Sequence, residues 1–212
     1  MRQWLQPDLT PKTRLRLVQE GIQAKGWKVR GWPRLAPKFL RKLSQVWPPL
    51  KTIVLADGHD VWSDEALLGK LGHEGEHMAS AIEKGRYYFT WMYACGPLLA
   101  TIALVLLVVA AGLDIGDVGA SRWVGIAAFT SAVASIFMWK QSEDFRRADE
   151  VQAFAVSAAV LMVLVGAEHT HNQAKKHFGA QTLHGWAYPY LVGGGYYALV
   201  DDVAQRTLEV LS

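Results

Sequence analysis

Cysteine is almost absent from this sequence of 212 residues, since Cys95 is the only one and it lies in an apolar run. A single cysteine excludes an intramolecular disulfide and a multi-cysteine metal site. The first thirty residues also lack the apolar core of a secretory signal peptide, so we expect any membrane insertion to use an internal segment.

Charge is scarce and unevenly distributed. Only 19% of the residues are charged, whereas 51% are hydrophobic, and residues 1–51 hold twelve Lys and Arg but only Asp8 and Glu20 as acidic residues. A basic arm can bind nucleic acid. Beside apolar segments it is more typical of a cytoplasmic segment near anionic lipids, so we expect a lipid bilayer rather than a nucleic acid as partner.

The basic arm contains a predicted amphipathic helix over residues 12–25, followed by a segment rich in Trp, Pro and Arg. Trp27, Trp32 and Trp47 have two interpretations. They either lie at the level of the lipid headgroups or fill a small core.

Three apolar runs follow. Residues 87–113 contain no charge in 27 positions, more than the ~20 needed to cross a bilayer, and residues 123–139 form a 17-residue run between tryptophans. We expect a transmembrane hairpin over residues 87–140. Its linker has aspartates but no Lys or Arg, which predicts a tip facing away from the cytoplasm. The third run, residues 151–167, either spans the membrane or packs as a buried helix.

The segment before the first apolar run predicts a strand and a helix. Residues 51–56 are apolar and β-branched and lie between turn-forming residues, which is typical of a short strand. Ser63 as an N-cap and Gly85 as a stop predict a helix over residues 64–84.

This predicted helix contains the pattern His-Glu-x-x-His at His73, Glu74 and His77. A spacing of four residues places both imidazoles on one helix face, where they can bind one Zn²⁺, with Glu74 beside them as the general base. The alternative is a helix turn that carries these residues by chance.

A catalytic zinc ion needs a third protein ligand, and Glu150 is the best candidate because it stands at the start of the third apolar run. Glu143 and Asp144 are weaker alternatives. Two spans between the motif and Glu150 would return the chain to the side of the membrane that it left. We therefore favour a buried helix over residues 151–167, packed against the motif helix.

In their order, these features resemble the membrane gluzincin peptidases, which include the CAAX prenyl endopeptidase and its bacterial heat-shock relative. Those proteins have an H-E-x-x-H helix, two transmembrane spans and then a helix that opens with E-x-x-A-D, whose Glu is the third ligand. Residues 150–154, EVQAF, match all but the last position. Phe154 thus replaces a carboxylate that would orient a ligand or neighbour.

The resemblance covers residues 50–165, while the amino-terminal arm departs from the family, whose members usually have spans before the motif. It implies that the strand at 52–55 is an edge strand that holds an extended peptide substrate. The alternative is a purely structural strand.

Together these patterns predict a mainly α-helical, membrane-associated metallopeptidase with a short β element before the motif helix. It has two transmembrane helices, or three if the third run also spans. We divide the chain into a basic arm (1–50), a strand and motif helix (51–86), a transmembrane hairpin (87–140), and a Glu-ligand helix with the carboxy-terminal part (141–212).

The predicted function is zinc-dependent endopeptidase activity on a peptide or protein substrate, at the cytoplasmic face of a membrane. Zinc would activate water and polarise the scissile carbonyl, and Glu74 would move the proton from the water to the leaving amine. The spacing selects no donor for the oxyanion among four candidates: Arg147, His184, Tyr188 and Tyr190.

Two other classes of protein stay open. One is a noncatalytic membrane scaffold or bilayer-remodelling protein, in which His73 and His77 hold a structural metal or none. The other is a soluble protein with very apolar core helices. Four further histidines are expected in turns or solvated loops rather than in a metal site: His59, His169, His171 and His177.

Overall fold

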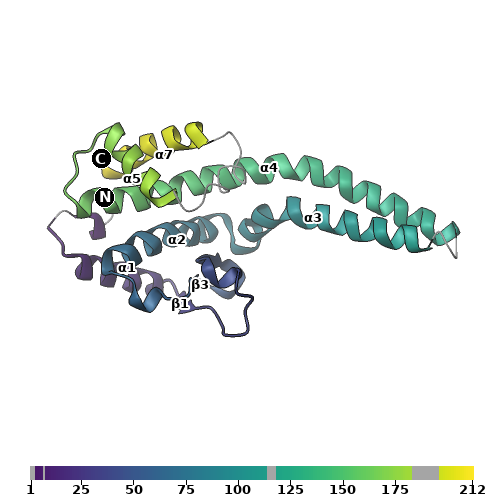
Figure 1. The fold of residues 1–212 in the computed structure, drawn as a ribbon, viewed down its shortest axis with the longest axis horizontal. Helices are drawn as coiled ribbons and strands as arrows, with labels where there is room; N and C mark the ends of the chain where they lie inside the picture. Colours follow the sequence, from purple (N-terminus) through teal and green to yellow (C-terminus); the bar gives the residue numbers. More distant parts are fainter. Residues whose placement is uncertain (1–2, 7, 114–117, 183–195) are drawn as a thin grey trace. The chain divides into compact units, whose positions relative to one another are not determined.

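The structure is a computed structural model, and it describes residues 3–6, 8–113, 118–182 and 196–212 (Figure 1). The described chain is mainly helical with one small sheet, as the sequence predicts. It divides into a first unit, Met1–Phe89 with Arg147–Ser212, and a second unit, Thr90–Arg146.

The sheet of the first unit has three strands in the order β1 (Lys28–Gly31), β3 (Thr52–Leu55), β2 (Gln45–Trp47). The predicted strand is therefore confirmed as β3. It pairs in parallel with β1 and antiparallel with β2, and all four of its residues are buried. Because β3 is paired on both sides, it has no free edge to which a peptide could add. The prediction that residues 52–55 form an edge strand is therefore wrong. The two partner strands of β3 both come from the basic arm, and no pattern in the arm predicted that it forms strands.

The basic arm also contributes helix α1 (Pro11–Ala24), which confirms the predicted helix. Thr10 caps it by accepting a hydrogen bond from the Thr13 amide. The Arg14 guanidinium is buried and donates to the carbonyl oxygens of Leu9 and Trp4 at 2.9 Å, which ties the amino-terminal turn to α1. α1 packs against both α2 and β1.

Helix α2 (Asp64–Lys84) has the predicted bounds. The Ser63 hydroxyl accepts a hydrogen bond from the Ala66 amide at 3.2 Å, and Gly85 follows the helix with φ = 89°, a conformation that favours glycine. Two glycines allow α2 and α4 to approach closely. The Ser157 hydroxyl donates to the Gly69 carbonyl at 3.1 Å, and a Cβ at Gly72 would lie 3.5 Å from the nearest Val160 methyl.

Helix α4 (Val118–Leu164) is continuous through Glu150. The prediction of a separate helix that begins near Glu150 is wrong, because the residues between the second and third apolar runs include no Pro or Gly and are mostly good helix formers. Glu150 is consequently held by helix on both sides.

The third apolar run is buried within the first unit, as we favoured. The carboxy-terminal part of α4 packs against α5 (His171–Thr182) and α7 (Tyr196–Leu211). Two clusters of buried side chains form this core: Ala155, Phe178, Leu199 and Val203, and then Ala159, Met162, Ala174, Ala204 and Leu211.

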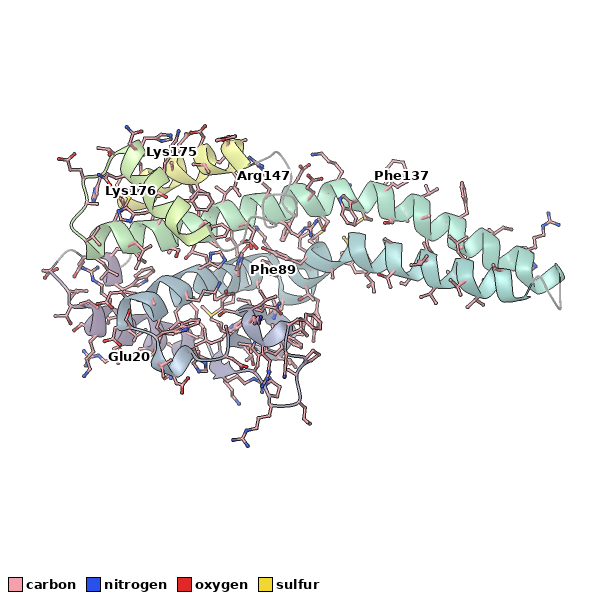
Figure 2. The ribbon with its side chains drawn as sticks, in the orientation of Figure 1. Glu20, Phe89, Phe137, Arg147, Lys175 and Lys176 are labelled. Carbon is pink, nitrogen blue, oxygen red and sulfur yellow. The ribbon has the colours of Figure 1, made fainter. Side chains whose placement is uncertain are left out.

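The second unit is a pair of helical segments from α3 (Arg86–Leu113) and α4. Within it, the Ser142 hydroxyl donates to the Met92 carbonyl at 2.6 Å, and the rings of Tyr93 and Phe145 meet edge to face. Large apolar side chains point outward, among them Phe137 (Figure 2). Others on this surface are Leu104, Val108, Trp123, Phe129 and Ile136.

Among the described residues, one helix is long and apolar enough to cross a membrane, the part of α4 from Arg122 to Leu164. A second candidate exists only if the bent pair Arg86–Cys95 and Leu98–Ala111 of α3 is counted as one span. The structure thus supports one candidate span directly, and the predicted two-span hairpin stays a prediction.

Candidate metal centre

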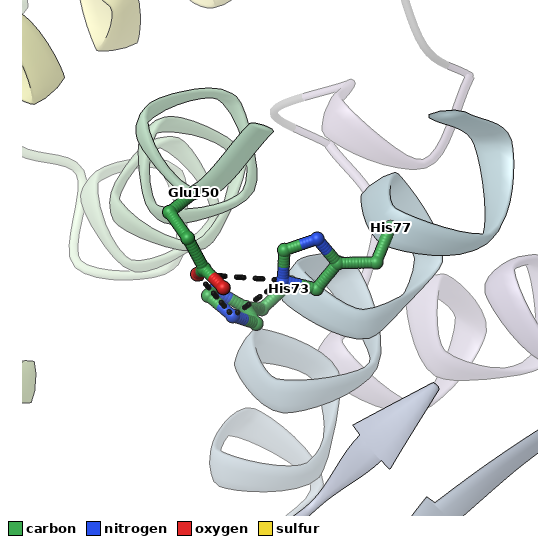
Figure 3. Close-up of side chains that lie close together, drawn as sticks. All are labelled: His73, His77 and Glu150. Atoms are coloured by element: carbon green, nitrogen blue, oxygen red, sulfur yellow. Dashed lines mark hydrogen bonds and ion pairs between the residues drawn. The ribbon is translucent and has the colours of Figure 1, made fainter. Parts of the chain in front are cut away.

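Two helices of the first unit bring three potential ligands together. His73 and His77 project from one face of α2, and Glu150 projects toward them from α4 (Figure 3). The two Nε2 atoms lie 3.1 Å apart, and Glu150 Oε2 lies 3.5 Å from His73 Nε2 and 3.4 Å from His77 Nε2. All three side chains are buried.

These distances fit a tetrahedral metal ion. Zinc bonds to nitrogen and oxygen are about 2.0–2.1 Å long, and a tetrahedron with such bonds has edges of about 3.3–3.4 Å. Within the part of the chain that the structure describes, these three residues form the one group that could hold a metal ion. Imidazole and carboxylate ligands suit zinc and several other divalent transition metals.

Asp149 orients one of the ligands. Its Oδ2 lies 2.5 Å from Nδ1 of His77, and because a carboxylate only accepts, His77 donates Nδ1–H to it. Nε2 of His77 is then the atom that faces His73 and Glu150, which is the arrangement typical of a metal-binding histidine. Lys84 lies 3.8 Å from the other oxygen of Asp149.

Asp149 was not among the residues expected at the site. The orienting carboxylate was expected at position 154, one turn after Glu150, where this chain has Phe154. The sequence does place Asp149 directly before Glu150, at the border of the apolar run. Successive residues on a helix point about 100° apart, so neighbouring carboxylates can reach different sides of one site.

Phe154 packs against the site instead. Its ring centroid lies 4.6 Å from that of His73 and 5.1 Å from that of Phe178, with tilted, edge-like geometry in both pairs. His73 is thus restrained by aromatic packing, whereas His77 is restrained by a hydrogen bond.

The charges of the site favour a cation at its centre. Burial alone would lower the pKa of His77, but the carboxylates of Glu150 and Asp149 outweigh burial and raise it well above the usual value. Burial lowers the pKa of His73. The Nε2 atoms of His73 and His77 and the Oε2 atom of Glu150 lie close together, and their lone pairs would repel one another without a positive charge among them. That charge is either a proton on an imidazole or a metal ion.

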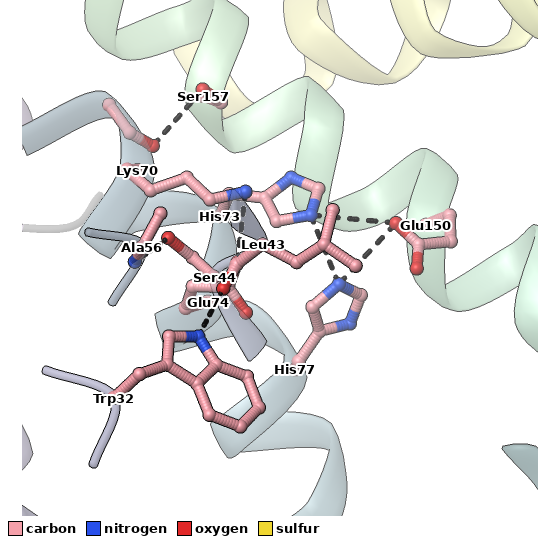
Figure 4. A network of polar contacts seen from close by, with 11 residues as sticks. Trp32, Leu43, Ser44, Ala56, Lys70, His73, Glu74, His77, Glu150 and Ser157 are labelled. Atoms are coloured by element: carbon pink, nitrogen blue, oxygen red, sulfur yellow. Dashed lines mark hydrogen bonds and ion pairs between the residues drawn. The ribbon is translucent and has the colours of Figure 1, made fainter. Parts of the chain in front are cut away.

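Glu74 is buried one residue after His73, and its Oε1 lies 3.0 Å from Lys70 Nζ (Figure 4). Burial would raise the pKa of Glu74, but Lys70 and the two histidines outweigh burial and lower it. The carboxylate is therefore ionised at neutral pH, as a general base must be. A cavity of 260 Å³ lies beside His73, and its wall also includes Lys70 and Phe154.

The other residues that the sequence suggested for the site are not part of the His73, His77 and Glu150 group. Arg147, a proposed oxyanion donor, forms an ion pair of 2.6 Å with Asp202 of α7. The remaining three donors, His184, Tyr188 and Tyr190, lie outside the described residues.

Of the alternative ligands, Asp144 pairs with Lys140 at 2.8 Å, and neither it nor Glu143 belongs to the three-residue group. The Nδ1 atom of His59 lies 3.0 Å from the Ala56 carbonyl in the turn η4 (His59–Val61), which confirms a role in turn structure. His171 and His177 both lie in α5, so the loop predicted for them is wrong, and His171 pairs with Asp201.

No protein-family model matches this chain, and no curated protein or solved structure matches it either. The class that the fold and the site define is therefore a mainly helical protein with a buried His-His-Glu group that could hold a metal ion and with one helix able to cross a membrane.

Proposed function

We propose that this chain is a zinc-dependent endopeptidase with His73, His77 and Glu150 as metal ligands and Glu74 as the general base. The observation that carries the proposal is the spacing of the three ligand atoms, which matches the edges of a zinc tetrahedron, next to an ionised Glu on the same helix. The H-E-x-x-H order and its resemblance to membrane gluzincins support the same function.

A zinc ion bound there would lower the pKa of a water molecule and polarise a peptide carbonyl. Glu74 accepts the proton of that water and delivers it to the leaving amine. Asp149 keeps Nε2 of His77 directed at the metal position. The cavity beside His73 is large enough for one or two substrate side chains, and we place part of the substrate there.

We further propose that the protein is integral to a membrane, with this site on the cytoplasmic side and a membrane-associated or unfolded protein as substrate. The exposed apolar surface of the second unit and the basic residues 1–51 support this placement. In a Cys95→Ser background, a membrane-impermeant maleimide should label Asp117→Cys on intact cells but label Glu20→Cys only after lysis. The reverse pattern would refute the proposed sidedness.

The activity is tested with Glu74→Gln. This variant should bind zinc like the parent protein but cleave fluorescein-labelled casein at least about 100-fold more slowly, because general-base catalysis contributes a factor of that size. Glu83→Gln, an exposed change on the same helix, is the matched control and should cleave at the parental rate.

One observation favours a second function, a noncatalytic membrane protein with a structural metal: the ligands are deeply buried and Lys70 pairs with Glu74. A structural zinc site is closed, whereas a catalytic site keeps one position open. If the parent and Glu74→Gln bind zinc equally and cleave nothing, the structural function stands and the peptidase proposal fails.

A further inference from the structure

The loop between β1 and β2 exposes apolar side chains on the first unit. Leu35 is 99% exposed and Phe39 is 69% exposed, and Leu43 in the same loop is about half exposed. The loop extends away from the sheet (Figure 1). Side chains of this size normally lie in a core, so their exposure in one loop indicates a surface that contacts something apolar.

The same segment carries only positive charge. Residues 28–51 hold seven Lys and Arg and no Asp or Glu. Arg34, Lys38 and Lys42 alternate with the apolar side chains and are exposed. Arg41 differs from them, since it pairs with Asp57 at 3.3 Å and so belongs to the framework of the loop.

The base of the loop is closed by hydrogen bonds, several of which appear in Figure 4. The Trp32 indole donates to the Leu43 carbonyl at 2.6 Å, and its ring meets that of Trp47 edge to face. The Ser44 hydroxyl accepts from the Ala56 amide at 3.0 Å. These bonds fix the two ends of the loop that carries Leu35 and Phe39.

We propose that this loop, residues 33–43, anchors the first unit to a bilayer surface that contains anionic lipids. Leu35 and Phe39 enter the interfacial layer, while Arg34, Lys38 and Lys42 pair with lipid phosphates. A nucleic acid would match the charge but would leave a fully exposed leucine without an apolar partner. Of the three tryptophans for which the sequence left a headgroup position or a small core open, Trp27 is buried, Trp32 is bonded at the base of the loop, and Trp47 is 40% exposed.

This anchor is independent of the metal site and of the proposed peptidase activity. It also differs from the candidate spanning helix, because it requires anionic headgroups rather than a hydrocarbon core of a given thickness. The contact is therefore expected to weaken at high salt.

The test uses the full chain, Cys95→Ser, with a spin label at Leu35→Cys, reconstituted into vesicles of phosphatidylcholine with or without phosphatidylglycerol. In anionic vesicles the label should become accessible to oxygen and protected from a water-soluble nickel reagent. A label at the exposed Glu20→Cys of α1 should stay in water in both vesicle types.

A companion variant carries Arg34→Glu, Lys38→Glu and Lys42→Glu. It should lose the protection of the label in anionic vesicles, since each cation near such a surface contributes about fivefold to binding. Circular dichroism on heating verifies that the variant folds. A label that stays in water in anionic vesicles would overturn the proposal, as would protection by added RNA without protection by lipid.

Discussion

At the scale of single residues, two neighbouring carboxylates of α4 have different tasks. Glu150 directs Oε2 at Nε2 of both histidines, while Asp149 reaches around to Nδ1 of His77. Their separation by about 100° on the helix makes this division possible. One residue offers an oxygen that could bind a metal ion, and the other fixes the tautomer of His77.

Asp149→Ala should lower the zinc affinity about 10- to 100-fold, the usual effect of removing a carboxylate that orients a metal-binding histidine. Asp149→Asn should lose less zinc affinity, because its amide oxygen can still accept the hydrogen bond from Nδ1 of His77. Competition with a chromophoric chelator measures both affinities. Asp144→Ala, on the same helix but paired with Lys140, is the control and should bind zinc as the parent does. Equal affinities for Asp149→Ala and the control would remove Asp149 from the site.

The three residues of the candidate metal group could be predicted from the sequence, but most of their surroundings could not. The i, i+4 spacing of two histidines fixes their common face, and the apolar run after Glu150 pointed to a helix that packs against them. The packing of Phe154 on His73, and the pairing of Arg147 with Asp202, depend on rotamers and on partners distant in the sequence. No spacing rule reports such partners.

At the scale of the elements, the contact between α2 and α4 sets the ligand distances. Gly69 and Gly72 face Ser157 and Val160, and the absence of side chains there allows the backbones to approach. The site therefore depends on two small residues, Gly69 one turn before His73 and Gly72 directly before it.

Gly72 offers a graded test of this contact. A Cβ there would meet neighbours at 3.5–3.6 Å, which is ordinary van der Waals contact, so Gly72→Ala should keep the zinc affinity and raise the helix stability by about 0.5–1 kcal/mol. Gly72→Leu should overpack the contact, destabilise the fold by about 1–3 kcal/mol and weaken zinc binding. Chemical denaturation and zinc titration measure these effects. A leucine variant with parental stability and affinity would contradict the close packing.

Local signals predicted the helices better than the sheet. Ser63 and Gly85 marked the ends of α2, because capping is local chemistry. The parallel pairing of β1 with β3 joins residues more than twenty positions apart, such as Val29 with Ile53, and only the pairing of β2 with β3 is local in the sequence. For this reason no sequence pattern indicated that two strands of the basic arm, β1 and β2, pair with β3.

At the scale of the whole molecule, the two units differ in how they treat apolar side chains. The first unit has a buried apolar core around α4, α5 and α7, whereas the second exposes many large apolar side chains along both of its helical segments. Exposed apolar surface of this kind is costly in water and favourable in lipid.

The chain should therefore remain in the membrane pellet after extraction with sodium carbonate at high pH, which releases peripheral proteins but not integral ones. Detergent should release it. If carbonate alone moves the chain to the supernatant, the apolar helices belong to a soluble or peripheral protein, and the proposed membrane placement is wrong.

The most direct test of the account is the zinc content of the detergent-purified chain after metal loading, beside Glu150→Ala and the control Asp144→Ala. We predict one zinc ion per chain in the parent and in Asp144→Ala, and a clear loss in Glu150→Ala. No zinc in the parent, or equal zinc in Glu150→Ala, would contradict the metal centre and, with it, the proposed peptidase.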